Sequence, residues 1–193
     1  MSSREKILAA VKNNQPQLIS LEKKNYKSVA TGDVHQFEAT LKAIGAKVFS
    51  ISHGEDIIKH IEDLFPEAKR VVSSVTSIER HFINDHRNII HNTLQDVDVA
   101  IIKAQFGVAE NGAVWVTEDD LKIRVLPFIC EHLVAIVDSG DIVPDMHEAY
   151  ERIGSAEYGF GAFIAGPSKT ADIEQSLVLG AHGPKSMTVL IRR

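Results

Sequence analysis

The sequence contains a single cysteine, Cys130, among 193 residues. One thiol excludes an internal disulfide and any iron–sulfur cluster held by several thiolates of this chain. Cys130 lies in the apolar stretch LPFICEHLVAIV. We therefore expect it to be a small buried hydrophobic side chain rather than a reactive thiol.

Long apolar runs and an excess of positive charge are also missing. No run approaches the roughly 18 to 20 residues that span a bilayer. The N-terminal MSSREKILAAVKNN has no apolar core followed by a small-residue cleavage site. We therefore expect a cytoplasmic protein without a membrane span. The net charge of −5 argues against a general nucleic-acid surface, because phosphate binding needs clustered Lys and Arg.

The familiar phosphate-binding and metal-binding motifs are absent as well. GVAENGAV has two glycines but no following Lys-Ser/Thr pair, and no GxGxxG opens a helix after the first predicted strand. The histidines form no HExxH motif, and His81, His86 and His91 are five residues apart, which does not place them on one helical face at the usual i,i+3 or i,i+4 spacing. We therefore expect exposed histidines on helices or loops, no metal and no nucleotide held by these loops.

What is present suggests a short arm followed by one domain. Ser2 and Glu5 form a capping-box pattern ahead of apolar residues, which predicts a helix over 3–13. Residues 14–32 are polar and irregular. We predict an N-terminal helix and linker arm over residues 1–32, and a single folded domain over residues 33–193.

Within residues 33–193, helical and strand patterns alternate. The predicted helices cover 33–44, 55–65, 76–85, 145–153 and 171–179. The predicted strands cover 46–52, 69–74, 97–104, 132–138, 161–166 and 187–192. This alternation predicts an α/β fold with a mostly parallel sheet and helices on both faces. The AENGAVWV segment, residues 109–116, predicts an antiparallel element within that sheet.

The AENG stretch is the first candidate site. Asn111-Gly112 is a strong signal for a type I′ hairpin turn, which would leave Glu110 solvated beside it. Alternatively, Glu110 is a base or an acyl-accepting nucleophile at a tight turn, where glycine lets a substrate approach the backbone.

The second candidate site follows the predicted strand 161–166. Gly166 should end that strand at the C-terminal edge of the parallel sheet, where ligands of open α/β sheets bind. The predicted helix start would offer free N–H groups to an anion. The candidate ligand-binding residues are Gly166, Ser168, Lys169, Thr170, Asp172 and Glu174. The two acids also suit a purely structural role, because acids in a first turn complement the helix dipole.

His182 is the third candidate. It stands between Gly180 and Gly183, just ahead of Pro184 and the final apolar run. A helix-to-strand loop needs no imidazole, whereas proton transfer near neutral pH suits one. We therefore take His182 as a candidate catalytic residue and Gly183 as a candidate binding residue.

The stretches GVAENGAVWVTED, LPFICEHLVAIV and AGPSKTADIEQSLVLGAHGPKSMTVLI resemble the LUD domain of the lactate-utilisation protein C (LutC/YkgG) family. The resemblance covers residues 35–193, and GPSKTADIE…GAHGP is its specific part. It implies a fold like that of the NagB/RpiA/CoA-transferase group of isomerases and transferases. It also implies a role in oxidising L-lactate to pyruvate alongside two iron–sulfur partners, with a small organic acid as ligand and no cofactor in this chain.

Two alternatives stay open. AENG is similar to the SENG stretch of class I CoA transferases, whose Glu forms an acyl intermediate; this likeness implies that role for Glu110. The other alternative is a non-catalytic subunit whose loops form an interface.

Overall fold

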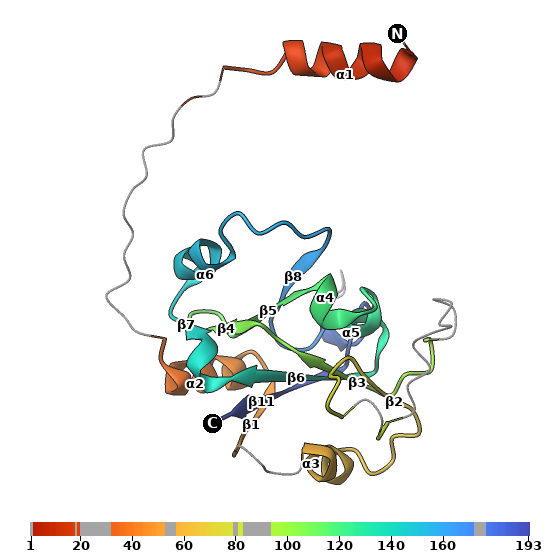
Figure 1. Ribbon diagram of the computed structural model, residues 1–193. Helices are drawn as coiled ribbons and strands as arrows, with labels where there is room; N and C mark the ends of the chain where they lie inside the picture. Colours follow the sequence, from red (N-terminus) through yellow and green to blue (C-terminus); the bar gives the residue numbers. More distant parts are fainter. Residues whose placement is uncertain are drawn as a thin grey trace.

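The computed structural model describes residues 2–17, 19, 32–52, 57–78, 81–82, 94–171 and 177–193 (Figure 1). Helix α1 (Ser3–Asn13) begins at the predicted capping box, in which Ser2 and Glu5 bond to each other's backbone N–H. It buries no side chain. The linker prediction falls mostly on residues outside the described ranges, so the boundary near residue 33 stays a prediction.

A five-stranded sheet forms the centre of the molecule, in the order β1-β11-β6-β3-β2. All its neighbouring strands run parallel. The strands are β1 (Lys47–Ile51), β2 (Val71–Ser73), β3 (Val99–Lys103), β6 (His132–Asp138) and β11 (Ser186–Arg192). Strands β3, β6 and β11 are buried along almost their whole length, as expected for parallel strands covered on both faces.

Helices cover both faces of this sheet. On one face, Phe37 and Leu41 of α2 (Val34–Ala43) pack in the same core cluster as Leu133 and Val137 of β6. The short helices α4 (Glu118–Leu121) and α5 (Leu126–Ile129) add to this cluster. On the other face, α3 (Ile57–Leu64) brings Ile61 against the alternate residues of β6. The predicted α/β class, with a mostly parallel sheet and helices on both faces, is confirmed.

A second sheet lies beside the first, in the order β7-β4-β5-β8. Its strands are β4 (Phe106–Val108), β5 (Ala113–Thr117), β7 (Ile142–Val143) and β8 (Gly161–Ile164). The predicted antiparallel element exists as β4 and β5, but it lies in this separate sheet and not within the parallel one. β8 pairs antiparallel with β5, so the strand predicted over 161–166 does not end at the edge of the parallel sheet.

The second sheet has its own small core, which explains why it separates from the first. Val114 and Val116 face the main core, whereas Phe106 and Trp115 pack in a third cluster. Helix α6 (Met146–Ile153) packs against that cluster. The Asp145 side chain caps the N-terminus of α6 by accepting a hydrogen bond from the Glu148 N–H at 3.0 Å. The helix predicted over 145–153 is therefore confirmed.

The helix predicted over 171–179 is wrong in its described part. β9 (Lys169–Ala171) pairs antiparallel with β10 (Leu177–Leu179), with Thr170 opposite Val178. β-Branched residues favour such a pairing, and the strand ladder supplies the hydrogen bonds that a helix would have made. Residues 166–171 contain no helix start, so the anion site predicted there has no basis in the described residues. Asp172 and Glu174 lie outside the described residues.

Of two other helix predictions, one is confirmed and the other lies only partly within the described residues. Helix α2 is confirmed: Asp33 caps it by accepting from the His35 N–H at 2.8 Å, and Gly45, with φ of 94°, ends it. The helix predicted over 76–85 lies largely outside the described residues, and residues 76–78 form a turn.

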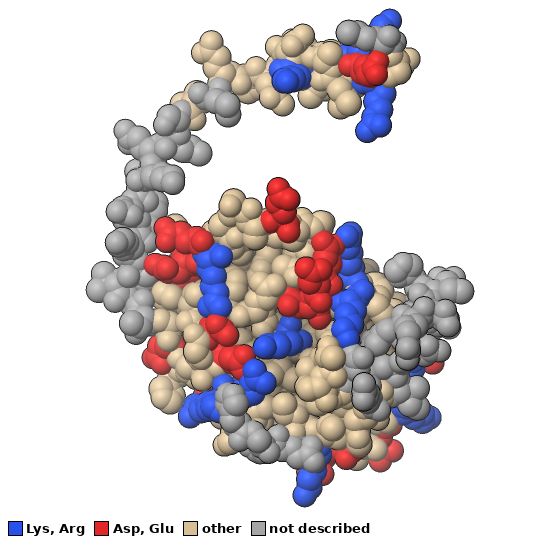
Figure 2. Space-filling model, in the orientation of Figure 1, with Lys and Arg blue, Asp and Glu red and all other residues tan. Residues whose placement is uncertain are grey.

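Charges of both signs are mixed on the surface. Figure 2 shows Lys and Arg interspersed with Asp and Glu over the visible face. Within the described part of the chain, no helix is long and apolar enough to cross a membrane.

Candidate functional site

The AENG stretch forms a hairpin between β4 and β5. The pairing of Val108 with Ala113 leaves a four-residue loop, Ala109–Gly112, which the Gly112 N–H closes on the Val108 carbonyl at 2.9 Å. The Asn111 side chain accepts from the Ala113 N–H at 2.9 Å. The predicted hairpin is confirmed. The predicted type I′ geometry is wrong. Both central residues of a type I′ turn have a positive φ, whereas here Gly112 has a positive φ and Asn111 does not.

Glu110 is exposed and caps a helix. Its Oε2 accepts from the Met146 N–H at 3.0 Å, at the first residue of α6, while its own N–H donates to the Pro144 carbonyl at 3.0 Å. A carboxylate at a helix N-terminus satisfies an N–H that has no partner within the helix and complements the helix dipole. This contact gives Glu110 a structural task, and the alternative role as a nucleophile is left to experiment.

We expect the Glu110 carboxylate to stabilise the fold and not to accept acyl groups. Glu110→Gln should lower the free energy of unfolding by about 0.3 to 1 kcal/mol. Acetyl-CoA should leave the intact mass of the wild-type chain unchanged. Denaturant titration and mass spectrometry measure the two effects, with the exposed Glu157→Gln as the matched control. An added acetyl mass that Glu110→Gln abolishes would establish acyl transfer instead.

Two candidate glycines pack against the end of α2. A Cβ on Gly112 would lie 3.0 Å from Ile44 Cδ1, and a Cβ on Gly166 would lie 3.2 Å from Ile44 Cγ1. Both glycines have positive φ, 70° and 74°. Glycine is thus required at both positions by conformation and by close packing. Ile44 occupies the space beside these two glycines, where the sequence suggested that a substrate would bind.

Polar contacts complete this region, which we call the α2 joint (Thr40, Ile44, Ala109, Gly112, Gly166 and Lys169). Lys169 Nζ donates to the Ile44 carbonyl at 2.6 Å, and Thr40 Oγ1 donates to the Ala109 carbonyl at 2.9 Å. A cation is favourable at a helix C-terminus, where carbonyl groups lack partners within the helix. The structure therefore brings two predicted segments together, around a packed helix end.

His182 lies elsewhere, in a cleft of about 350 Å³ that we call the His182 cleft. Its lining residues come from segments 95–98, 128–131 and 180–185. These segments precede β3, β6 and β11, which are adjacent in the parallel sheet. The cleft therefore lies at the N-terminal edge of the parallel sheet, whereas the sequence predicted a site at the C-terminal edge.

An exposed imidazole and an ion pair are the main polar groups of the His182 cleft. His182 is exposed, and Lys185 Nζ contacts Glu131 Oε1 at 2.6 Å. The hydrogen bond and the charge of Lys185 lower the pKa of Glu131. Cys130 lines the cleft, but its side chain is only 2% exposed, and burial raises its pKa to about 12. The prediction of a buried cysteine is confirmed.

Ser168 and Gly183, both candidate binding residues, lie side by side. The Ser168 N–H donates to the Pro184 carbonyl at 2.9 Å, and the Ser168 carbonyl accepts from the Gly180 N–H at 3.1 Å. A Cβ on Gly183 would lie 3.2 Å from the Ser168 Cβ. These bonds hold the loop that carries His182 against the chain leading into β9. They place Ser168 next to the His182 cleft, while Thr170 lies in β9.

From the sequence, His182 was proposed as a candidate, but the charged residues that lie around it were not. A charged residue directly precedes each of three buried parallel strands. These residues are Asp98 before β3, Glu131 before β6 and Lys185 before β11. A charged residue in that position is a usable signal, since the starts of adjacent parallel strands meet at one edge of the sheet.

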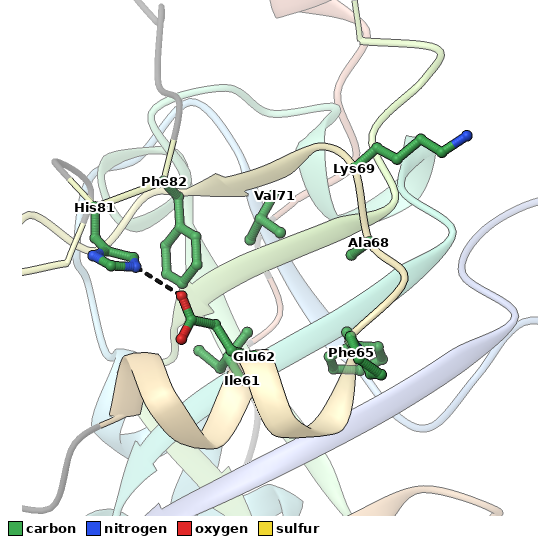
Figure 3. Close-up of a pocket in the computed structure, with 9 residues that line it drawn as sticks. Ile61, Glu62, Phe65, Ala68, Lys69, Val71, His81 and Phe82 are labelled. Atoms are coloured by element: carbon green, nitrogen blue, oxygen red, sulfur yellow. Dashed lines mark hydrogen bonds and ion pairs between the residues drawn. The ribbon is translucent and has the colours of Figure 1, made fainter.

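A smaller hollow of about 270 Å³ lies between α3 and β2 (Figure 3). Its walls include Ile61, Phe65 and Phe82, and His81 Nε2 contacts Glu62 Oε1 at 2.9 Å at one side. His81 is exposed, as predicted. His86 and His91 lie outside the described residues, and the described residues hold no cluster of three His, Cys, Asp or Glu suited to a metal.

Comparisons with known proteins match most of this fold. The sequence profile of the LUD domain matches residues 34–191. A lactate utilization protein C from Oceanobacillus iheyensis is 30% identical over 103 residues, which are 50% of this chain and 44% of that protein. A lactate utilization protein C 1 from Bacillus mycoides is 38% identical over 93 residues, 45% of this chain and 40% of that protein. The matched segments thus span less than half the length of these relatives.

A solved structure supports the same fold. The crystal structure of a DUF162 family protein from Deinococcus radiodurans superposes with a TM-score of 0.62, covering 82% of this chain and 95% of that chain at 18% identity. At that identity the likeness bears on the fold alone. The profile match covers well over half of the sequence. The chain therefore belongs to the LUD domain family.

Proposed function

We propose that this chain acts in lactate utilisation, as a subunit that contributes to the oxidation of L-lactate to pyruvate together with iron–sulfur partner proteins. The observation that carries the proposal is the LUD domain match over residues 34–191, with relatives named lactate utilization protein C. The α/β fold is consistent with a ligand-binding domain.

Electron transfer in such a complex would be the task of the partners. Oxidation of lactate to pyruvate releases two electrons, which a cofactor must accept. The only thiol of this chain, Cys130, is buried with a pKa raised to about 12. One protonated thiol cannot supply the several thiolates of a cluster. These properties support clusters in partner proteins and a ligand-contacting or partner-contacting role for this chain.

The His182 cleft is the part of the chain that we assign to this role. Its imidazole is exposed on a loop held by Ser168, next to the Lys185–Glu131 ion pair. Histidine is the side chain best suited to proton transfer near neutral pH, which the removal of the hydroxyl proton of lactate requires. An exposed loop side chain also contributes little to stability.

His182→Gln should therefore reduce growth on lactate while leaving the fold intact. We expect the free energy of unfolding to change by about 0.5 kcal/mol or less, because the side chain is exposed. Growth is measured on lactate and on glucose, in cells of the source organism that lack the native gene and carry the variant. Melting curves of the purified chain test stability.

The matched control is His35→Gln, an exposed histidine in the first turn of α2. It should support normal growth on lactate. Normal growth of the His182→Gln strain would show that this imidazole is dispensable. Normal growth of cells without the gene would refute the role in lactate utilisation altogether.

A further inference from the structure

Next to the His182 cleft lies a larger cavity of about 450 Å³, lined by Lys47, Leu64, Phe65, Pro66, Glu67, Ala68, Asp98, Glu131, His132 and Ser186. We call it the strand-start cavity. Lys47, Ser186 and His132 are the first residues of β1, β11 and β6, and Asp98 directly precedes β3. Four adjacent parallel strands therefore each place a polar residue at one edge of the sheet. The end of α3 and the turn after it form the opposite wall.

Two residues that line this cavity, an imidazole and a hydroxyl, are hydrogen-bonded to each other. His132 Nδ1 and Ser186 Oγ are 2.8 Å apart, and the two residues are directly opposite each other in the sheet. Phe65 packs against the imidazole, with ring centroids 5.2 Å apart. His132 Nε2 lies 4.0 Å from Glu131 Oε1, beyond hydrogen-bond distance. The ring is thus held in place, while Nε2 makes no hydrogen bond with the residues that the structure describes.

This pair presents a free donor in either neutral tautomer. If Ser186 donates to Nδ1, the imidazole carries its proton on Nε2, and that N–H is free. If Nδ1 donates to Ser186, the hydroxyl proton is free. A ligand oxygen can therefore accept a hydrogen bond from the pair in both cases.

Lys47 is the charged group of the cavity that a ligand carboxylate can pair with. Asp98 already accepts from the Lys69 and Arg70 N–H groups at 2.7 and 2.8 Å, and Glu131 is paired with Lys185 at 2.6 Å. The Lys47 ammonium, by contrast, has no partner among the described residues. Glu67 is exposed on the turn after α3. The unused groups of the cavity are thus the Lys47 ammonium and the His132–Ser186 pair, which donate, and the exposed Glu67 carboxylate, which accepts.

A buried hydroxyl lies next to two of the residues that line the cavity, Lys47 and Ser186. Thr188 is fully buried, and its Oγ1 has no hydrogen-bond partner among the described residues. It lies two residues after Ser186 on β11, so both side chains lie on the face that α3 covers, and it is directly opposite Lys47. An unpartnered buried hydroxyl is costly, which makes a ligand or water beside it favourable.

We propose that the strand-start cavity binds a small organic carboxylate with a hydroxyl or carbonyl oxygen on the neighbouring carbon. Lys47 holds the carboxylate, and the His132–Ser186 pair donates to the second oxygen. The volume lies within the range of small-molecule sites. The choice of a 2-hydroxy or 2-oxo acid rests on the proposed function, whereas the site itself rests on its geometry.

Binding is tested by imidazole NMR of the full chain, with the His132 signals assigned by comparison with His132→Gln. L-Lactate, pyruvate and acetate serve as probes. We expect lactate or pyruvate to shift the His132 signals saturably. Acetate, which lacks the second oxygen, should bind about tenfold more weakly. Lys47→Met should weaken binding about tenfold or more, because a charge-assisted hydrogen bond is lost.

The matched control is Lys42→Met, an exposed lysine on α2. It should bind like the wild-type chain. The proposal is overturned if none of the probes shifts the His132 signals, or if Lys47→Met binds as tightly as Lys42→Met. Saturable binding together with normal lactate growth of cells that lack the gene would refute the proposed function and retain the site.

Discussion

Replacing Phe37 with alanine is expected to lower the free energy of unfolding by about 3 to 5 kcal/mol. Phe37 is fully buried in the largest core cluster, where α2 packs on the central sheet. Its ring lies on the backbone of β4, since a Cβ on Gly107 would lie 2.7 Å from Phe37 Cζ. Truncation would leave a cavity between two sheets and a helix, which the close packing of these elements cannot refill.

The measurement is a denaturant titration of both variants under identical conditions. Phe128→Ala is the matched control, because Phe128 is 41% exposed on α5. It should cost less, since 41% of its surface stays in contact with water in the folded chain. Equal losses for the two variants would contradict the packing of α2 described above.

Alkylation of Cys130 should be at least about a thousandfold slower in the folded chain than in the unfolded chain. Burial raises its pKa from 9.0 to about 12. At pH 8 the thiolate fraction thus falls from about one tenth to about one ten-thousandth, and the thiolate is the reacting form. The low exposure of 2% slows the reaction further, because the reagent must reach the sulfur.

Iodoacetamide labelling followed by mass spectrometry measures this difference. The native chain should remain unmodified under conditions that label it completely in guanidinium chloride. Cys130→Ser provides the baseline in both solutions. Comparable labelling rates in both solutions would show that the wall of the His182 cleft opens readily or that the thiol is ionised, and either result would contradict the structure.

Strongly patterned elements were predictable from the sequence, whereas their assignment to sheets was not. The strands at 97–104 and 132–138 are continuous apolar runs, which is typical of strands buried on both faces, and both are confirmed. The strand at 161–166 is also confirmed as a strand, but its sheet was wrong. Periodicity records which faces are buried and carries no information on which strand pairs with which.

The error over 171–179 has a different cause. The segment ADIEQSLVL has acids near its start and apolar residues near its end, a pattern that suits an amphipathic helix. In the structure, Leu177–Leu179 pairs with Lys169–Ala171, leaving Val178 and Leu179 42% and 48% exposed. Short apolar runs of this kind fit either element, and the pairing partner decides between them.

The candidate site shows the same division. His182 could be predicted because glycines flank it and packing gives it no evident task. In the sequence, its neighbours Glu131 and Asp98 are recognisable only as charged residues ahead of buried strands, because the register of β11, β6 and β3 is what brings them beside it. Glu110 is the reverse case. The sequence suggested that this residue is a nucleophile. In the structure, the start of α6, 36 residues later, lies against the Glu110 carboxylate and gives it a capping role.

The strand order has a consequence for synthesis on the ribosome. β11 is the final strand in the sequence, yet it lies between β1 and β6, and β1 pairs with it alone in the parallel sheet. A nascent chain therefore carries β1 and β6 with unpaired edges until β11 has been translated. Unpaired edges are templates for aggregation. We expect a ribosome-associated chaperone to engage the growing chain during this interval, and late translational pauses to be harmful.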